Sequence, residues 1–114
     1  MENEKSDLKE LTFDDLQSYL SQKYSKRISS SSLFMKLVEE VGEVAEVLNQ
    51  LEGRKASTKE NSLEKELADV IHYTVAIASL NQIDLTKVIL EKDKEAAKKY
   101  NQTPNLEEYL QSIQ

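Results

Sequence analysis

Apolar residues recur at intervals of three and four along most of this chain, which is the spacing of amphipathic α-helices. Four main helices and a short closing one are predicted, over 13–24, from 29–32 to 51, from 57–62 to 80, over 85–100 and over 106–113. Thr12 and Asp84 are expected N-caps, and Gly53 is an expected terminator. We therefore expect an all-α protein of the four-helix-bundle type.

Each predicted helix carries an apolar stripe that is expected to face the core. On the first helix the stripe is Leu16, Tyr19 and Leu20. On the second it has seven members, which are Phe34, Leu37, Val38, Val41, Val44, Ala45 and Leu48. The third helix is apolar on nearly all sides over the run VIHYTVAIASL. Three neighbouring helices would leave part of that surface uncovered, so an oligomer, in the simplest case a homodimer, is expected.

The composition excludes several classes of protein. A chain of 114 residues that is 39% hydrophobic fits one domain over 12–114, after a flexible N-terminal tail over 1–11. No apolar run approaches the roughly 20 residues needed to cross a bilayer, so no membrane partner is expected. The formal charge of -6 offers no broad basic face to a nucleic acid polymer. The charged start lacks signal-peptide features and cysteine is absent, which predicts a cytoplasmic protein.

Two acidic motifs lie on the second and third predicted helices, EEVGE over 39–43 and ELAD over 66–69. Acidic residues three apart share one face of a helix, so the two helices together offer four carboxylates. At about 100° per residue, Glu66 projects within about 40° of Val70, on the apolar side of its helix. An ionised carboxylate there costs several kcal/mol unless it has a partner such as a divalent cation.

A donor set made only of oxygens suits Mg²⁺, with Mn²⁺ as a substitute, and implies phosphate chemistry. An E-E-x-x-E motif alone is common on helix surfaces, but the second acidic pair on a core-side face favours a metal site. His72 raises a di-iron alternative, because carboxylate-bridged di-iron bundles use Glu-x-x-His pairs. This chain has one histidine, which projects opposite Val70. We therefore expect His72 at a surface or interface and not as a ligand.

The runs KLVEEVGEVAEVLNQ, ELADVIHYTVAIAS and IDLTKVILEKDKEAAKKY, in this order, resemble the MazG-like nucleotide pyrophosphohydrolases of the all-α NTP pyrophosphatase superfamily. The resemblance covers about Phe34 to Tyr100. It implies a MazG-like fold, a homodimer or homotetramer, and hydrolysis of nucleoside triphosphates to a monophosphate and pyrophosphate. The bond that this reaction breaks is the α–β phosphoanhydride.

The resemblance also assigns residues to roles. The implied metal ligands are Glu40, Glu43, Glu66 and Asp69. Glu39 is implied to orient a ligand or the attacking water and joins Glu40 as a catalytic residue. The implied substrate-binding residues are Lys36, Tyr73, Lys92 and Lys99. Relatives commonly carry Asn where this chain has Ala96 and Arg where it has Lys99, so the fourth helix departs from the family pattern.

The function expected from these motifs is a Mg²⁺-dependent nucleoside triphosphate pyrophosphohydrolase that cleans the nucleotide pool. Two alternatives stay open. One is a noncatalytic nucleotide-binding or regulatory bundle, which Ala96 motivates. The other is a structural helical module, which would require Glu66 to be satisfied without a metal.

Overall fold

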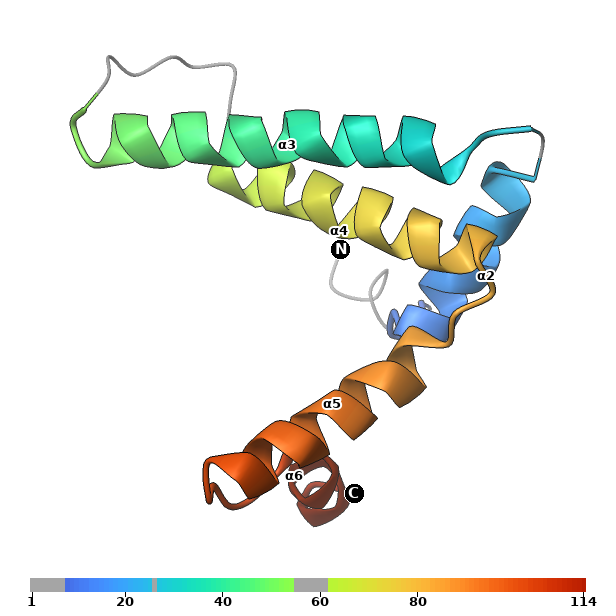
Figure 1. Ribbon diagram of the computed structural model, residues 1–114, viewed down its shortest axis with the longest axis vertical. Coiled ribbons are helices and arrows are strands. Elements are labelled where there is room, and N and C mark those ends of the chain that lie inside the picture. Colours follow the sequence, from blue (N-terminus) through green and yellow to red (C-terminus); the bar gives the residue numbers. More distant parts are fainter. Residues whose placement is uncertain (1–7, 26, 55–61) are drawn as a thin grey trace.

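The computed structural model describes residues 8–25, 27–54 and 62–114, and every regular element within these ranges is an α-helix (Figure 1). The helices are α2 (Phe13–Lys23), α3 (Ser30–Leu51), α4 (Leu63–Leu80), α5 (Leu85–Lys99) and α6 (Leu106–Ser112). The predicted all-α class is confirmed. Residues 1–7 of the predicted tail and 57–61 of the predicted start of the third helix lie outside the described residues.

Side-chain caps explain where the helices begin. A side-chain oxygen of each N-cap residue accepts the backbone N–H three positions further on, which satisfies a donor that the first turn leaves without a helical partner. These residues are Thr12, Ser29, Ser62, Asp84 and Asn105. Gly53 follows α3 with a φ of 79°, a conformation that glycine adopts without strain. These local signals are why the predicted boundaries agree closely with the observed ones.

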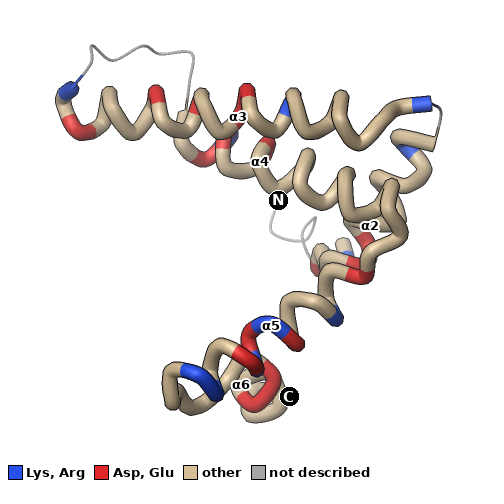
Figure 2. Tube along the Cα trace, viewed as in Figure 1, with Lys and Arg blue, Asp and Glu red and all other residues tan. Residues whose placement is uncertain are grey.

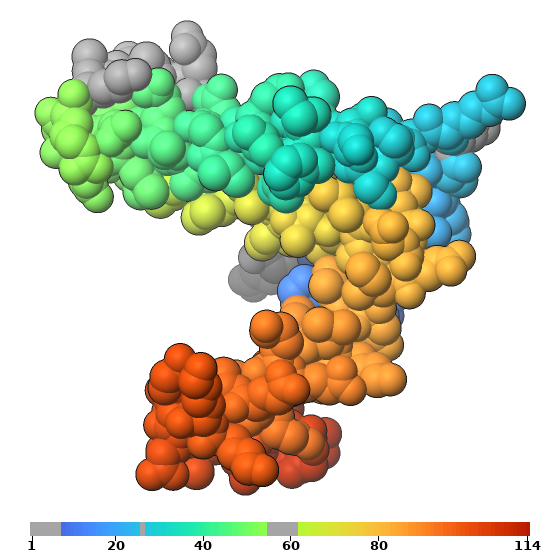
Figure 3. Space-filling view, viewed as in Figure 1, coloured from blue at the N-terminus to red at the C-terminus, as the bar shows by residue number. Residues whose placement is uncertain are grey.

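The helices form a hairpin with an arm. α3 and α4 run antiparallel along each other, and α2 packs against α4 near the end where α4 finishes (Figure 1). α5 then leaves this end and diverges from the hairpin, with its main contacts to α6 and α2. Figure 3 shows the open angle between the hairpin and the arm formed by α5 and α6. The described part of one chain therefore does not close into a bundle on its own.

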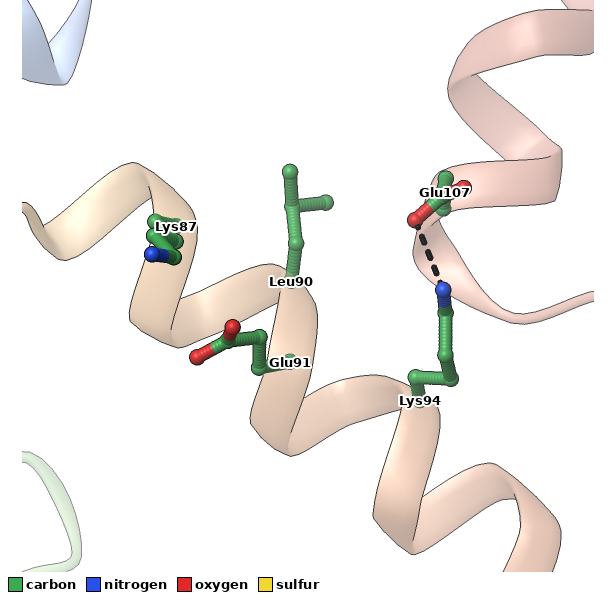
Figure 4. A pocket seen from close by; sticks show the side chains of 5 residues that line it. All are labelled: Lys87, Leu90, Glu91, Lys94 and Glu107. Carbon is green, nitrogen blue, oxygen red and sulfur yellow. Dashed lines mark ion pairs between the residues drawn. The ribbon is translucent and has the colours of Figure 1, made fainter.

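Two polar contacts hold the arm together. The backbone N–H of Leu106 donates to Asp93 Oδ2 at 2.6 Å, and Lys94 Nζ lies 3.2 Å from Glu107 Oε1 (Figure 4). The first contact satisfies a free donor at the start of α6. α6 is thereby fixed on the outer half of α5.

The core lies where α2, α3 and α4 meet. Leu20, Leu33, Val75 and Ala76 are each no more than 1% exposed. Tyr19 was expected in this core, but the prediction is wrong, because its side chain is 59% exposed. Tyr19 lies about 100° from the buried Leu20 around α2, outside the side that α4 covers.

The predicted core stripe of α3 is also wrong for the single chain. α3 buries Leu33 and Val47, whereas five of the seven predicted members of the stripe are exposed, namely Ala45 and the four larger residues Phe34, Val38, Val41 and Leu48. These four share a side of the helix that lies about 100° from Leu33. With Met35 they form what we call the apolar face of α3, whose members are 38–60% exposed. α4 covers one apolar side of α3 and leaves this face open.

Along the part of the chain that the structure describes, no helix has both the length and the apolar character needed to cross a membrane.

The packing predicts that substitutions at two neighbouring residues of α2 change the free energy of unfolding by very different amounts. Leu20→Ala should lower the free energy of unfolding by about 2–5 kcal/mol, because it removes a fully buried side chain. Tyr19→Ala, which changes an exposed side chain, should lower it by less than about 1 kcal/mol. Urea denaturation followed by circular dichroism measures both, and equal losses would contradict the described core.

Candidate metal centre

Three carboxylates from two helices converge in the seam of the hairpin. Glu40 of α3 and Glu66 and Asp69 of α4 each offer an oxygen, and these oxygens lie within 4.8 Å of one another. Glu66 and Asp69 are three positions apart on α4 and so lie on adjacent turns. Glu40 lies on the side of α3 that carries Leu33 and Val47 and faces α4. Figure 2 shows acidic segments of α3 and α4 next to each other.

Burial differs across these three residues, which we call the carboxylate triad. Glu66 is 9% exposed and is the buried charged residue among the described ones. Glu40 is partly buried, and Asp69 is exposed. The prediction that Glu66 lies on the core side of its helix is confirmed. The triad therefore has one oxygen donor inside the seam and opens to solvent at Asp69.

Crowding of three carboxylates shifts the protonation of the triad. Burial, followed by hydrogen bonding to Glu66 and the negative charge of Asp69, raises the pKa of Glu40 to about 7. Without a cation, the triad therefore tends to hold a proton near neutral pH. A bound cation would replace that proton, because metal ligation favours the ionised carboxylate.

The donor atoms of the triad suit a hard divalent cation. All three ligands are carboxylate oxygens, which Mg²⁺, Mn²⁺ and Ca²⁺ prefer over softer metals. Three protein ligands would leave coordination positions for water and for the oxygens of a phosphate. The seam thus has a donor set that suits a hard divalent cation.

Two other predicted site residues on α3 lie beside the triad. Glu43, one turn after Glu40, is partly buried and does not belong to the three residues whose oxygens converge. Glu39 is exposed, and its Oε1 lies 3.8 Å from Lys36 Nζ. Lys36 thus forms an ion pair with Glu39, which lies three positions further along α3. An exposed pair at this distance stabilises little, so both side chains are available for other contacts.

Three aromatic rings extend from α4 to α2 beyond the triad. Tyr73 is half-buried and packs against the core, and its ring centroid lies 4.8 Å from that of His72. His72 Nε2 lies 2.8 Å from the hydroxyl of Tyr24, and burial lowers the pKa of His72. His72 therefore joins α2 to α4 inside the chain and is outside the converging ligand set. The sequence analysis missed Tyr24, because no local pattern connects positions 24 and 72.

The two predicted lysines of α5 lie away from the triad of their own chain. Lys92 and Lys99 are exposed on the arm, which diverges from the hairpin (Figure 1). Lys99 Nζ lies 5.4 Å from the ring centroid of its neighbour Tyr100. The arm has a pocket of its own between α5 and α6, lined by Lys87, Leu90, Glu91, Lys94 and Glu107 (Figure 4). That pocket mixes both signs of charge and is separate from the triad.

Comparisons with known proteins identify the family and support the fold. Residues 28–103 match the sequence profile of the MazG nucleotide pyrophosphohydrolase domain. The crystal structure of iMazG from Vibrio DAT 722 is similar, with 28% identity and a TM-score of 0.59 over 81% of this chain and 100% of that one. The crystal structure of YPJD from Bacillus subtilis, which is proposed to be a pyrophosphatase, is also similar. The two chains are 26% identical, with a TM-score of 0.64, and the match covers 85% of this chain and 100% of YPJD. No curated protein matched the sequence. The matched profile spans the whole triad, and the similar structures confirm the expected fold.

The electrostatics of the triad predict how stability depends on pH. The raised pKa of Glu40 means that the folded chain binds a proton more tightly than the unfolded chain does. Its contribution to stability is therefore complete below the usual glutamate pKa and is lost as the pH rises through about 7. In metal-free buffer, the parent should lose more stability than Glu40→Gln between about pH 5 and pH 8. Denaturant midpoints measure this difference, and parallel pH profiles would contradict the assignment.

Proposed function

This chain belongs to the MazG nucleotide pyrophosphohydrolase family, and from that premise we propose that it is a metal-dependent enzyme that hydrolyses nucleoside triphosphates to monophosphates and pyrophosphate. The observation that carries the proposal is the convergence of Glu40, Asp69 and the buried Glu66 in one seam. A structural helix pair has no need of a buried carboxylate next to two others. The proposed role is removal of unwanted nucleotides from the cytoplasmic pool.

The proposed chemistry depends on Mg²⁺, with Mn²⁺ as a substitute. A divalent ion held by Glu40, Glu66 and Asp69 would neutralise charge on the triphosphate and make a bound water more acidic. Glu43 is adjacent on α3 and is proposed as a fourth ligand. Glu39 lies on the solvent side of Glu40, where it would orient the attacking water.

Four residues are proposed to bind the substrate. Lys36 lies one turn before Glu40 and would meet a phosphate after leaving its weak ion pair with Glu39. Tyr73 lies one turn after Asp69 and would contact the nucleotide with the exposed part of its ring. Lys92 and Lys99 would add positive charge to the phosphates. Because the arm diverges from the hairpin, these last two lysines would serve the triad of a second copy.

A noncatalytic nucleotide-binding protein is the second candidate function. Ala96 lacks the amide that relatives commonly carry there, and Lys99 lacks the planar fork of arginine. Both differences would weaken the binding of a nucleotide by α5. Release of pyrophosphate from a panel of ribo- and deoxyribonucleoside triphosphates, with and without Mg²⁺, separates the two functions. Binding without turnover for every nucleotide would favour the noncatalytic protein.

The triad assignment predicts the effect of conservative substitutions. Glu40→Gln, Glu66→Gln and Asp69→Asn should each lower kcat/KM by about 100-fold or more, because each removes a charged ligand. Far-UV circular dichroism should show that all three remain helical. Glu64→Gln, an exposed change on the same helix, is the matched control and should keep parental activity. Parental Mg²⁺-dependent turnover in any triad variant would remove that residue from the site.

The apolar face of α3 supports a proposed homodimer, with a homotetramer as the larger assembly. Five large apolar side chains are exposed along one side of this helix. A contiguous apolar patch of this kind is uncommon on the surface of a monomer and is typical of an interface. α4 adds exposed Leu67 and Ile71. Burying such surfaces is the usual driving force for subunit association. A second copy would also supply the helices that the open hairpin lacks for a closed bundle.

Sedimentation velocity tests the proposed assembly. The parent should sediment as a dimer or tetramer at micromolar concentration. Phe34→Asp places a charge in the apolar face and should shift the chain toward a folded monomer, because an unpaired charge at an apolar interface is costly. Gln22→Asp changes an exposed residue of α2 and should leave the assembly intact. A stable parental monomer would contradict the proposal.

A further inference from the structure

The turn between α4 and α5 is held by one side chain from α2. Gln17 Nε2 donates to the carbonyl oxygen of Ile83 at 2.6 Å, and Gln17 Oε1 accepts the backbone N–H of Leu85 at 3.1 Å. Ile83 belongs to the turn and Leu85 is the first residue of α5. The side-chain amide therefore spans the point at which α5 changes the direction of the chain. Leu85 N–H is also a donor that the start of a helix leaves without a helical partner.

Two further contacts flank this amide and involve the same helices. The hydroxyl of Ser79, near the end of α4, donates to the backbone carbonyl of Gln17 at 3.0 Å. The hydroxyl of Thr86, in the first turn of α5, donates to Asp14 Oδ1 at 3.2 Å. One face of α2 thus contacts both helices that meet at the turn.

We propose that Gln17 is a positioning residue that sets the direction of α5 and, through it, the reach of Lys92 and Lys99 toward the substrate phosphates. The second half of this inference rests on the proposed function. α5 has few contacts along the hairpin, so its direction depends on how the turn is held.

The geometry of α5 amplifies any change at this turn. Its 15 residues span about 22 Å at 1.5 Å per residue, so a rotation of about 10° at the turn displaces the far end by about 4 Å. Lys92 lies midway along the helix and Lys99 is its last residue. A binding group must be held to within about 0.5 Å of its productive place. A small loosening of the turn is therefore enough to weaken a phosphate contact.

Gln17→Met is the informative substitution, because it keeps the length and volume of the side chain and removes both hydrogen bonds. If Gln17 acts only by packing, this change leaves the direction of α5 and KM unaltered. Gln17→Asn keeps the amide on a shorter side chain that does not reach both backbone groups. If the methionine variant fails to fold, this variant tests whether the two hydrogen bonds set the direction of α5. Gln22→Met, at an exposed position of the same helix, is the matched control.

The direction of α5 can be measured without any enzyme assay. The chain has no cysteine, so Ala68→Cys on α4 and Lys98→Cys on α5 provide two unique exposed sites for spin labels. Double electron–electron resonance on labelled chain diluted into unlabelled chain reports the distance within one copy. The parent and Gln22→Met should give one narrow distribution. Gln17→Met or Gln17→Asn should broaden or shift it by about 4 Å or more, and an unchanged distribution would overturn the proposal.

Kinetics test the functional half of the proposal. Gln17→Met should raise KM for a triphosphate severalfold, with kcat within about twofold and Mg²⁺ affinity at the triad unchanged. Lys92→Ala is the comparison. If it raises KM and Gln17→Met does not, the role of Gln17 in substrate binding is overturned. If Lys92→Ala leaves KM unchanged, the proposed role of the lysines fails, while the distance measurement still decides whether Gln17 sets the direction of α5.

Discussion

A carboxylate buried between two helices is the constraint on which the rest of this molecule depends. Glu66 lies in the α3–α4 seam at 9% exposure, and an isolated charge at such a place costs several kcal/mol. Glu40 and Asp69 lie within 4.8 Å of Glu66, so the seam also concentrates like charge, and protonation of Glu40, whose pKa is raised to about 7, relieves this repulsion. The antiparallel pairing of α3 and α4 is therefore both the core of the fold and the support of the site.

Much of this arrangement follows from local sequence. Caps such as Thr12 and Asp84 act within four residues, so helix boundaries were predictable, and one helical turn relates Glu66 to Asp69. The apolar side of α4 also revealed that Glu66 is buried. The side of α3 that α4 covers was not predictable, because α3 has two adjacent apolar sides and sequence spacing does not distinguish them. Phe34 was assigned to the core for this reason and is exposed.

Contacts between distant segments were the other part that sequence could not supply. The hydrogen bond between Tyr24 and His72 and the two between Gln17 and the α4–α5 turn join positions 48 to 68 residues apart. Glutamine and tyrosine occur on many helix surfaces without such a role. Local spacing also does not encode the direction in which α5 leaves the hairpin, so the placement of Lys92 and Lys99 away from their own triad became visible only in three dimensions.

The proposed association through the apolar face of α3 has a consequence for ionic conditions. Each copy carries a formal charge of -6, so two copies repel each other at long range in dilute buffer. At physiological ionic strength the Debye length falls to about 8 Å, which screens this repulsion. Attraction between apolar side chains is not weakened by salt in the same way. If copies associate as proposed, salt would therefore shift the balance between these two forces toward contact through the apolar face.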